Sequence, residues 1–125
     1  MYFHDYDSKF YPAMPVVEIL IRRRTDQPPL TLTAIVDSGA DASMIPIHHL
    51  RSLKARKSRI RWLTSPVGTR IEVPIYALLI QIGSLRPIYS EVVGTQGEEI
   101  IIGRDILNQF VVTLDAPGLV VRITE

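Results

Sequence analysis

Asp37 is the residue whose place in the sequence most suggests chemistry. It follows Leu32 to Val36, an almost wholly apolar segment of the kind that forms a strand buried on both faces. A carboxylate at the end of such a strand enters a low-dielectric environment, where its charge needs a compensating partner. Ser38 offers a hydroxyl donor, and Gly39 has no Cβ, so its backbone N–H can approach the carboxylate. The pattern predicts an acid positioned at the mouth of a strand.

A carboxyl in this position suits hydrolysis when a second carboxyl faces it. Two carboxyls that share one proton cannot both ionise. One is then left as a general base that activates a water, while the other donates a hydrogen bond to the scissile carbonyl. An isolated Asp-Ser-Gly tripeptide is also ordinary turn chemistry, in which the aspartate only caps the turn. The sequence around the tripeptide is therefore needed to distinguish a catalytic aspartate from a turn cap.

The elements around Asp37 are mostly short strands, separated by seven glycines and nine prolines. We predict strands at residues 16–24, 30–36, 59–63, 70–82, 85–93, 99–102, 110–114 and 119–124. Short helices are predicted at residues 46–54 and 104–109. Many short strands with little helix predict an all-β sandwich or barrel.

One arrangement occurs twice in this pattern. The apolar residues Ala34 to Val36 run into Asp37-Ser38-Gly39, and Ile100 to Ile102 run into Gly103-Arg104-Asp105. Each is an apolar strand that ends abruptly at glycine and polar groups. The repetition suggests two related halves packed about a pseudo-twofold axis.

Two segments resemble those of one known family. Residues 34–45 resemble the active-site segment of the retropepsin-like aspartic proteases, the single-domain enzymes of retroviral type, with an apolar strand, Asp-Ser-Gly-Ala and a second short apolar strand. Residues 101–107 resemble the family's second landmark, two apolar residues and a glycine before a helical turn. Between them lies a hairpin where the family has its flap. The resemblance covers residues 16–124 and implies a retropepsin-like closed barrel or sandwich that forms an obligate homodimer.

The resemblance also implies roles for individual residues. Asp37 would be the catalytic aspartate, and one Asp37 from each subunit would activate a water between them. Ser38 and Gly39 would complete the active-site loop, with Ser38 bonding to the matching loop of the partner. Gly103 and Arg104 would hold the active-site loop in place without contacting the substrate. Substrate contacts are implied for Gly39, Ala40, Asp41, Val67 and Gly68, and Arg104 is expected to pair with Asp41.

This reading describes an aspartic endopeptidase that cleaves an extended polypeptide and needs no cofactor or metal beyond the catalytic water. The expected partners are a second copy of the chain and the polypeptide substrate. The predicted flap tip has one glycine, Gly68, whereas retroviral flaps are rich in glycine. An alternative is therefore a catalytically weak module of the same fold that dimerises or binds peptides. A further alternative is that the chain is a fragment of a longer protein.

Composition excludes several other classes. A net charge of +1 argues against a nucleic-acid binder, and six of the fourteen basic residues gather at residues 51–61, which we interpret as a solvated loop. The adjacent His48 and His49 should point apart, which does not favour a metal site. The absence of cysteine excludes thiol chemistry. Without a signal peptide or a membrane-spanning stretch, we expect a soluble, cytoplasmic protein that contacts no membrane.

The first fifteen residues stand apart in composition. Five of the eight Phe and Tyr residues lie within the first eleven positions. We therefore divide the chain into an aromatic arm, residues 1–15, and a single protease domain, residues 16–125. Exposed terminal aromatics favour an interface, so one hypothesis is that the arm wraps a partner subunit. Another is that the Phe10-Tyr11 bond is cleaved by the protein itself.

At 125 residues with one Asp-Ser-Gly motif, the chain would carry half of a two-carboxylate site.

Overall fold

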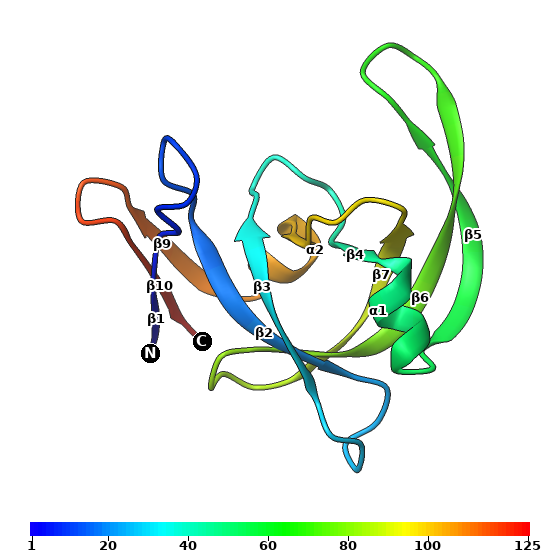
Figure 1. Cartoon of the computed structure of the whole chain (residues 1–125), viewed down its shortest axis with the longest axis horizontal. Coiled ribbons are helices and arrows are strands. Elements are labelled where there is room, and N and C mark those ends of the chain that lie inside the picture. The colour runs from blue at the N-terminus through cyan, green and yellow to red at the C-terminus, as the bar shows by residue number, and fades with distance from the viewer.

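A computed structural model describes all residues, 1–125, and contains ten strands and two short helices (Figure 1). The elements are β1 (Tyr2–Asp5), β2 (Val16–Arg22), β3 (Leu30–Val36), β4 (Met44–Pro46), α1 (Ile47–Ser52), β5 (Arg56–Thr64), β6 (Arg70–Ile82), β7 (Ile88–Thr95), β8 (Ile101–Ile102), α2 (Arg104–Leu107), β9 (Val111–Asp115) and β10 (Val120–Thr124). The prediction of a mainly β protein is confirmed.

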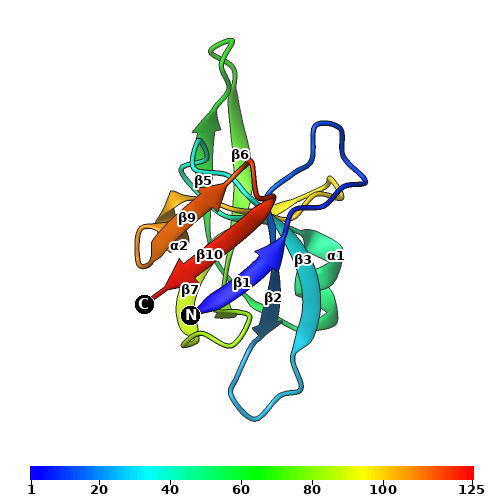
Figure 2. The ribbon, with the colours of Figure 1, turned by 90° about the vertical axis from the view of Figure 1, so that its left-hand side faces the viewer.

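The strands form two sheets. The larger has the order β2-β3-β8-β4-β7-β6-β5, and an additional pairing of β2 with β6 closes most of it into a barrel. The smaller has the order β1-β10-β9, and Figure 2 shows these three strands side by side at one side of the barrel. The N- and C-termini therefore lie in the same small sheet.

Alternation of side chains along the strands builds one core. In β2, for example, Val17, Ile19 and Ile21 are fully buried while Glu18 between them is exposed. Twenty-two buried residues form a continuous apolar cluster that draws on both sheets and both helices. Burial of apolar surface on this scale is the dominant favourable contribution to folding.

Strand β8 joins the two motifs of the sequence. It pairs in parallel with β3, with Ile35 opposite Ile101 and Val36 opposite Ile102. It also pairs with β4 through Met44 and Ile101, so β8 lies between β3 and β4. The two apolar segments that end alike in the sequence therefore end side by side in space.

Several predicted boundaries move. The first helix ends at Ser52 because Lys54 adopts a φ of 56°, and the backbone N–H groups of Lys54 and Ala55 close on the last turn. The second ends at Leu107. The strand predicted at residues 59–63 is confirmed, but it begins at Arg56 because β5 pairs along its length with β6, so residues 56–58 are not part of a solvated loop. No helix is long and apolar enough to cross a membrane.

The N-terminal residues also form a strand that the sequence did not predict. Tyr2–Asp5 pairs with β10 of the same chain. The hydroxyl oxygen of Tyr2 accepts a hydrogen bond from the backbone N–H of Glu18 at 2.9 Å, and its ring packs over Gly83. This burial raises the pKa of Tyr2. Tyr2 is thus held by its own chain.

Candidate active site

Asp37 lies at the first position after β3 and is partly buried. Its backbone N–H donates to the carbonyl of Ile102 at 3.0 Å, which continues the ladder between β3 and β8. The backbone N–H of Gly39 donates to Asp37 Oδ1 at 2.9 Å, and that of Ala40 donates to the carbonyl of Asp37 at 3.2 Å. A tight turn therefore holds the carboxylate against its own backbone, as the sequence predicts.

Arg104 binds the same loop from α2. Its Nη1 donates to the carbonyl oxygen of Ser38 at 2.6 Å, and its Nη2 donates to the carboxylate of Asp41. Its backbone N–H also donates to the carbonyl of Ala40 at 2.9 Å. The predicted contact between Arg104 and Asp41 is thus present. The two side chains are 42% and 91% exposed, so solvent screens the pair and it contributes more to loop geometry than to stability.

Gly103 allows α2 to approach this loop. A Cβ at residue 103 would lie 2.8 Å from the carbonyl oxygen of Ala40 and 2.9 Å from the carbonyl carbon of Ala42. Both are backbone atoms that cannot turn aside. The chain needs glycine here for space, because its φ of −97° is open to any residue.

Ser43 and Asp105 complete the support, and the sequence analysis did not assign them a role. Ser43 is fully buried, and its hydroxyl donates to Asp105 Oδ1 at 2.8 Å. The hydroxyl oxygen of Ser43 also accepts a hydrogen bond from the backbone N–H of Gly103 at 2.9 Å. The sequence signal for this supporting role was that both residues lie inside the two motifs. Their side chains join the loop after β3 to the start of α2.

The predicted substrate contacts divide into two groups. Gly39, Ala40 and Asp41 lie in the loop with Asp37, whereas Val67 and Gly68 form the tip of the β5–β6 hairpin, which projects beyond the barrel (Figure 1). At the tip, the backbone N–H of Gly68 donates to the carbonyl of Ser65 at 2.9 Å, and Gly68 has a φ of 86° that favours glycine. In Figures 1 and 2 the tip of this hairpin lies apart from the loop between β3 and β4.

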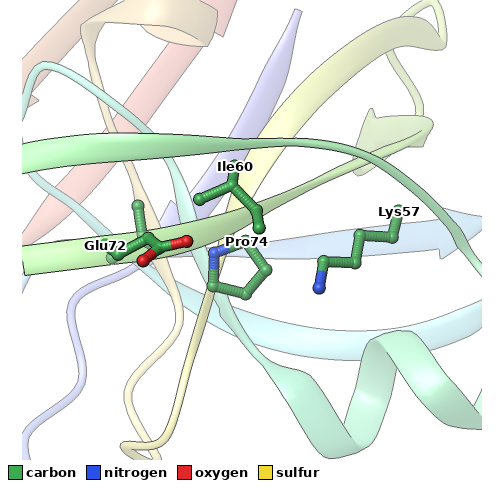
Figure 3. Close-up of a pocket in the computed structure, with 5 residues that line it drawn as sticks. Lys57, Ile60, Glu72 and Pro74 are labelled. Atoms are coloured by element: carbon green, nitrogen blue, oxygen red, sulfur yellow. The ribbon is translucent and has the colours of Figure 1, made fainter.

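The β5–β6 hairpin has surface features of its own. A pocket of about 240 Å³ lies against it, with Lys57 and Glu72 on either side of Ile60 and Pro74 (Figure 3). Trp62 is exposed, and the guanidinium of Arg70 lies 5.2 Å from its ring centroid. These groups give the hairpin a mixed apolar and charged surface.

The base of the hairpin is tied to β7 by Glu91. Its carboxylate accepts from the hydroxyl of Ser58 at 2.8 Å and from Arg59 Nη2 at 2.8 Å. The hydrogen bond from Ser58, followed by the charge of Arg59, lowers the pKa of Glu91, although partial desolvation opposes them.

The two adjacent histidines do not point apart, contrary to the sequence prediction. Their ring centroids lie 4.0 Å apart at an interplanar angle of 42° in helix α1. Burial lowers the pKa of His49, and the neighbouring His48 lowers it further, while Glu98 acts in the opposite direction. The prediction failed because rotation about the side-chain bonds can bring neighbouring rings together even where their Cα–Cβ bonds diverge.

Known proteins share both the sequence pattern and the fold. The family model described as retroviral aspartyl protease matches residues 12–115. The EIAV protease, solved in complex with the inhibitor HBY-793, is 26% identical with a TM-score of 0.60, over 77% of this chain and 86% of that chain. The foamy viral protease-reverse transcriptase, solved with double-stranded DNA, is 15% identical with a TM-score of 0.55, over 80% of this chain and 16% of that chain. No curated protein sequence matches the chain.

Proposed function

Because the chain belongs to the retroviral aspartyl protease family, we propose that it is an aspartic endopeptidase whose active site forms between two copies. The proposed catalytic residue is Asp37 of each subunit. The extended polypeptide substrate lies across both loops and beneath both β5–β6 hairpins, with Val67 and Gly68 of each hairpin tip above it. The assignment to the aspartic proteases follows from the family, and the dimeric mechanism is what we propose.

The observation that carries the proposal is the way in which Asp37 is held. Its backbone is anchored to Ile102, its carboxylate accepts from Gly39, and Arg104 binds the following loop. The nearest acid in the sequence, Asp41, is paired with Arg104. A two-carboxylate reaction therefore takes its second carboxyl from another copy of the chain.

The proposed reaction uses only these two carboxyls and a water. The ionised carboxyl accepts a proton from the water, and at the same time the water oxygen forms a bond with the carbonyl carbon of the peptide. The protonated carboxyl gives its proton to the carbonyl oxygen. In the second step one hydroxyl of the tetrahedral gem-diol gives its proton to the carboxyl that is now ionised and becomes the carbonyl of the product acid. The other carboxyl gives its proton to the amine nitrogen as the C–N bond breaks, so the dyad again holds one proton. Because one carboxyl is ionised and the other protonated, the rate should be bell-shaped against pH with an acidic optimum.

The remaining loop residues bind the substrate. An extended peptide is recognised mainly through main-chain hydrogen bonds, with side-chain pockets adding selectivity. The Gly39 carbonyl and the backbone and side chain of Ala40 and Asp41 are close to Asp37 and are exposed or half-buried. We assign them to main-chain contacts with the substrate, and the exposed hydroxyl of Ser38 to the loop of the second copy.

Replacement of Asp37 tests the function. Asp37→Asn keeps the size of the side chain and removes its charge, so cleavage of a mixed peptide library should fall by at least about a thousandfold. Asp26→Asn is the matched control, because Asp26 lies in an exposed turn and pairs only with Arg24 at the surface. Size measurements should show the same oligomer for all three proteins. Cleavage that survives Asp37→Asn in an intact dimer refutes the assignment. A dimer of the unaltered chain that binds extended peptides and cuts none makes it a binding module.

A further inference from the structure

Half of the chain's basic residues lie in one short part of the sequence. Residues 42–71 contain seven of the fourteen lysines and arginines and none of the thirteen acidic residues: Arg51, Lys54, Arg56, Lys57, Arg59, Arg61 and Arg70. All seven are exposed, and only Arg59 forms an ion pair, with Glu91. The net charge of +1 therefore conceals a basic segment beside an acidic remainder.

The β5–β6 hairpin has two faces, and only one of them belongs to the side of Asp37. Residues opposite one another in neighbouring strands share a face, and successive residues of a strand alternate. One row of opposite residues runs from β3 to β5: Ile35, Ile101, Met44, Val93, Ile75 and Arg59. Asp37 lies two residues after Ile35 and shares this face. Ile60 and Trp62 alternate with Arg59, so they lie on the other face of the hairpin, which we call the outer face.

The outer face combines cations with an exposed aromatic ring. Trp62 is 56% exposed, and the guanidinium of Arg70, from the neighbouring strand, lies 5.2 Å from its ring centroid. Lys57 lies nearer the base of the hairpin, close to the link between α1 and β5 that contains Lys54 (Figure 1). Surfaces that bind single-stranded nucleic acids combine cations along the phosphates with aromatic rings or guanidinium planes on which bases stack.

The pocket on the outer face adds a group that can read a base. Lys57 and Glu72 lie on either side of Ile60 and Pro74 (Figure 3). They form no ion pair with each other, so the ammonium and the carboxylate are both available to a ligand. The apolar side chains suit a flat ring, the ammonium suits a phosphate, and the carboxylate can accept from an exocyclic amine such as that of cytosine.

Glu72 favours a nucleic acid over an acidic polypeptide as the ligand. A carboxylate in the middle of the surface repels the carboxylates of such a polypeptide. A nucleic acid has its negative charge on phosphates and its amines on bases, so it can meet Lys57 with one and Glu72 with the other. In a duplex the bases are stacked and their pairing edges are occupied, whereas a single strand offers both to Trp62 and the pocket.

We propose that the outer face of the β5–β6 hairpin binds single-stranded nucleic acid. A base with an exocyclic amine enters the pocket and donates to Glu72, a neighbouring phosphate pairs with Lys57, and the next base stacks on Trp62 beside Arg70. The net charge of the whole chain argued against such a partner, but the structure gathers the cations on one hairpin. Because the outer face is turned away from Asp37, this binding does not rest on the proposed protease activity.

Fluorescence anisotropy with labelled oligomers of about ten nucleotides tests the base contact. Oligocytidine and oligouridine have the same backbone and charge, but only cytosine has an exocyclic amine. The unaltered chain should bind oligocytidine at least about fivefold more tightly. Glu72→Gln should reduce this preference to less than about twofold, because the amide can accept from cytosine or donate to uracil. Glu98→Gln, at another exposed acid, should retain the preference.

Two further variants separate the phosphate contact from stacking. Lys57→Gln should weaken binding severalfold and reduce the slope of log affinity against log salt concentration by about 0.7. Lys9→Gln, at an exposed lysine outside the hairpin, should change neither quantity. Trp62→Ala should weaken binding at least about fivefold with the same salt slope. Tyr89→Ala, at a residue that is 64% exposed, should bind like the parent.

Three results would overturn the proposal. They are equal affinity of the unaltered chain for oligocytidine and oligouridine, binding of poly-glutamate as tight as that of oligocytidine, and tighter binding of a duplex of equal length. Oligodeoxycytidine in parallel supports the proposal whether it binds more or less tightly than oligocytidine, and the difference identifies the preferred sugar. Every readout is binding alone. Asp37→Asn should therefore bind oligocytidine like the parent, so that failure of the protease proposal and failure of this one are distinguishable.

Discussion

The hydroxyl of Ser43 donates to Asp105 across 62 positions of sequence, at 2.8 Å, and the backbone N–H of Ser43 donates to the other carboxylate oxygen at 3.0 Å. Asp105 also accepts from the N–H of Ile106 at 2.9 Å. One buried hydroxyl and one carboxylate thus link the loop after Asp37 to the start of α2. Because this link holds both motifs together, its loss should affect folding before it affects chemistry.

Ser43→Ala should lower the free energy of unfolding by about 1–3 kcal/mol, because it leaves the buried N–H of Gly103 without its acceptor. Urea denaturation followed by circular dichroism measures the change. Ser52→Ala is the control, since Ser52 is exposed and bonds only to the carbonyl of His49; its effect should stay within about 0.5 kcal/mol. Equal stability of both variants would contradict the structural role of Ser43.

Gly103→Ala should destabilise the fold by about 1–3 kcal/mol or prevent folding, because the added methyl meets backbone atoms 2.8 and 2.9 Å away. Gly97→Ala is a close control, since a Cβ there has no neighbour within 4 Å and the residue does not have a positive φ. Thermal unfolding of both variants distinguishes a packing requirement from a general effect of replacing glycine. A Gly103→Ala protein as stable as the parent would disprove the close approach of α2 to the loop.

Arg104→Lys should lower kcat/KM by more than tenfold while changing the free energy of unfolding by less than about 1 kcal/mol. The lysine keeps the charge but loses the planar fork that binds Ser38 and Asp41 together. Arg24→Lys, in an exposed ion pair with Asp26, should leave both quantities unchanged. If Arg104→Lys unfolds the protein without an effect on the remaining folded enzyme, Arg104 is a stability residue and does not position the loop.

The hairpin base should respond to acid. The pKa of Glu91 is lower in the folded chain, so its bonds to Ser58 and Arg59 contribute stability above the ordinary value of 4.5 and lose it as pH falls through the folded value. The emission of Trp62, the sole tryptophan, should report this change on the same hairpin, with a midpoint below 4.5. Glu91→Gln should remove the transition and Glu98→Gln should retain it. A transition that persists in Glu91→Gln must arise elsewhere.

Activity per subunit should fall on dilution. If each chain supplies one Asp37, the monomer is inactive and the active fraction follows the dimer concentration by mass action. Specific activity and sedimentation measured over the same concentration series should decline together. An active monomer, with constant activity per chain through the dissociation range, would exclude a shared site.

Local contacts were predictable from the sequence because their partners are close along the chain. The bond from Gly39 to Asp37 spans two residues and follows from turn chemistry. The paired motifs and the alternation of apolar residues were sufficient for the family and the mainly β fold. The role of Asp37 in catalysis remains a prediction that rests on these features.

Contacts between distant residues were not predictable in the same way. The sequence predicted β5 only from residue 59, and residues 56–58 extend it because β6 pairs with Arg56 and Lys57. Likewise, the aromatic residues near the N-terminus suggested an arm, while Tyr2 is in fact anchored to Glu18 and Gly83.

The amino-acid sequence specifies which chemical groups the chain can offer: one Asp-Ser-Gly loop, one supporting Gly-Arg-Asp turn, and no second Asp-Ser-Gly motif. How these groups meet depends on the folded chain. Folding places β8 between β3 and β4, buries Ser43 against Asp105, and leaves β9 open beside the loop. Side-chain types are local properties, whereas strand order and burial depend on the packing free energy of the whole chain.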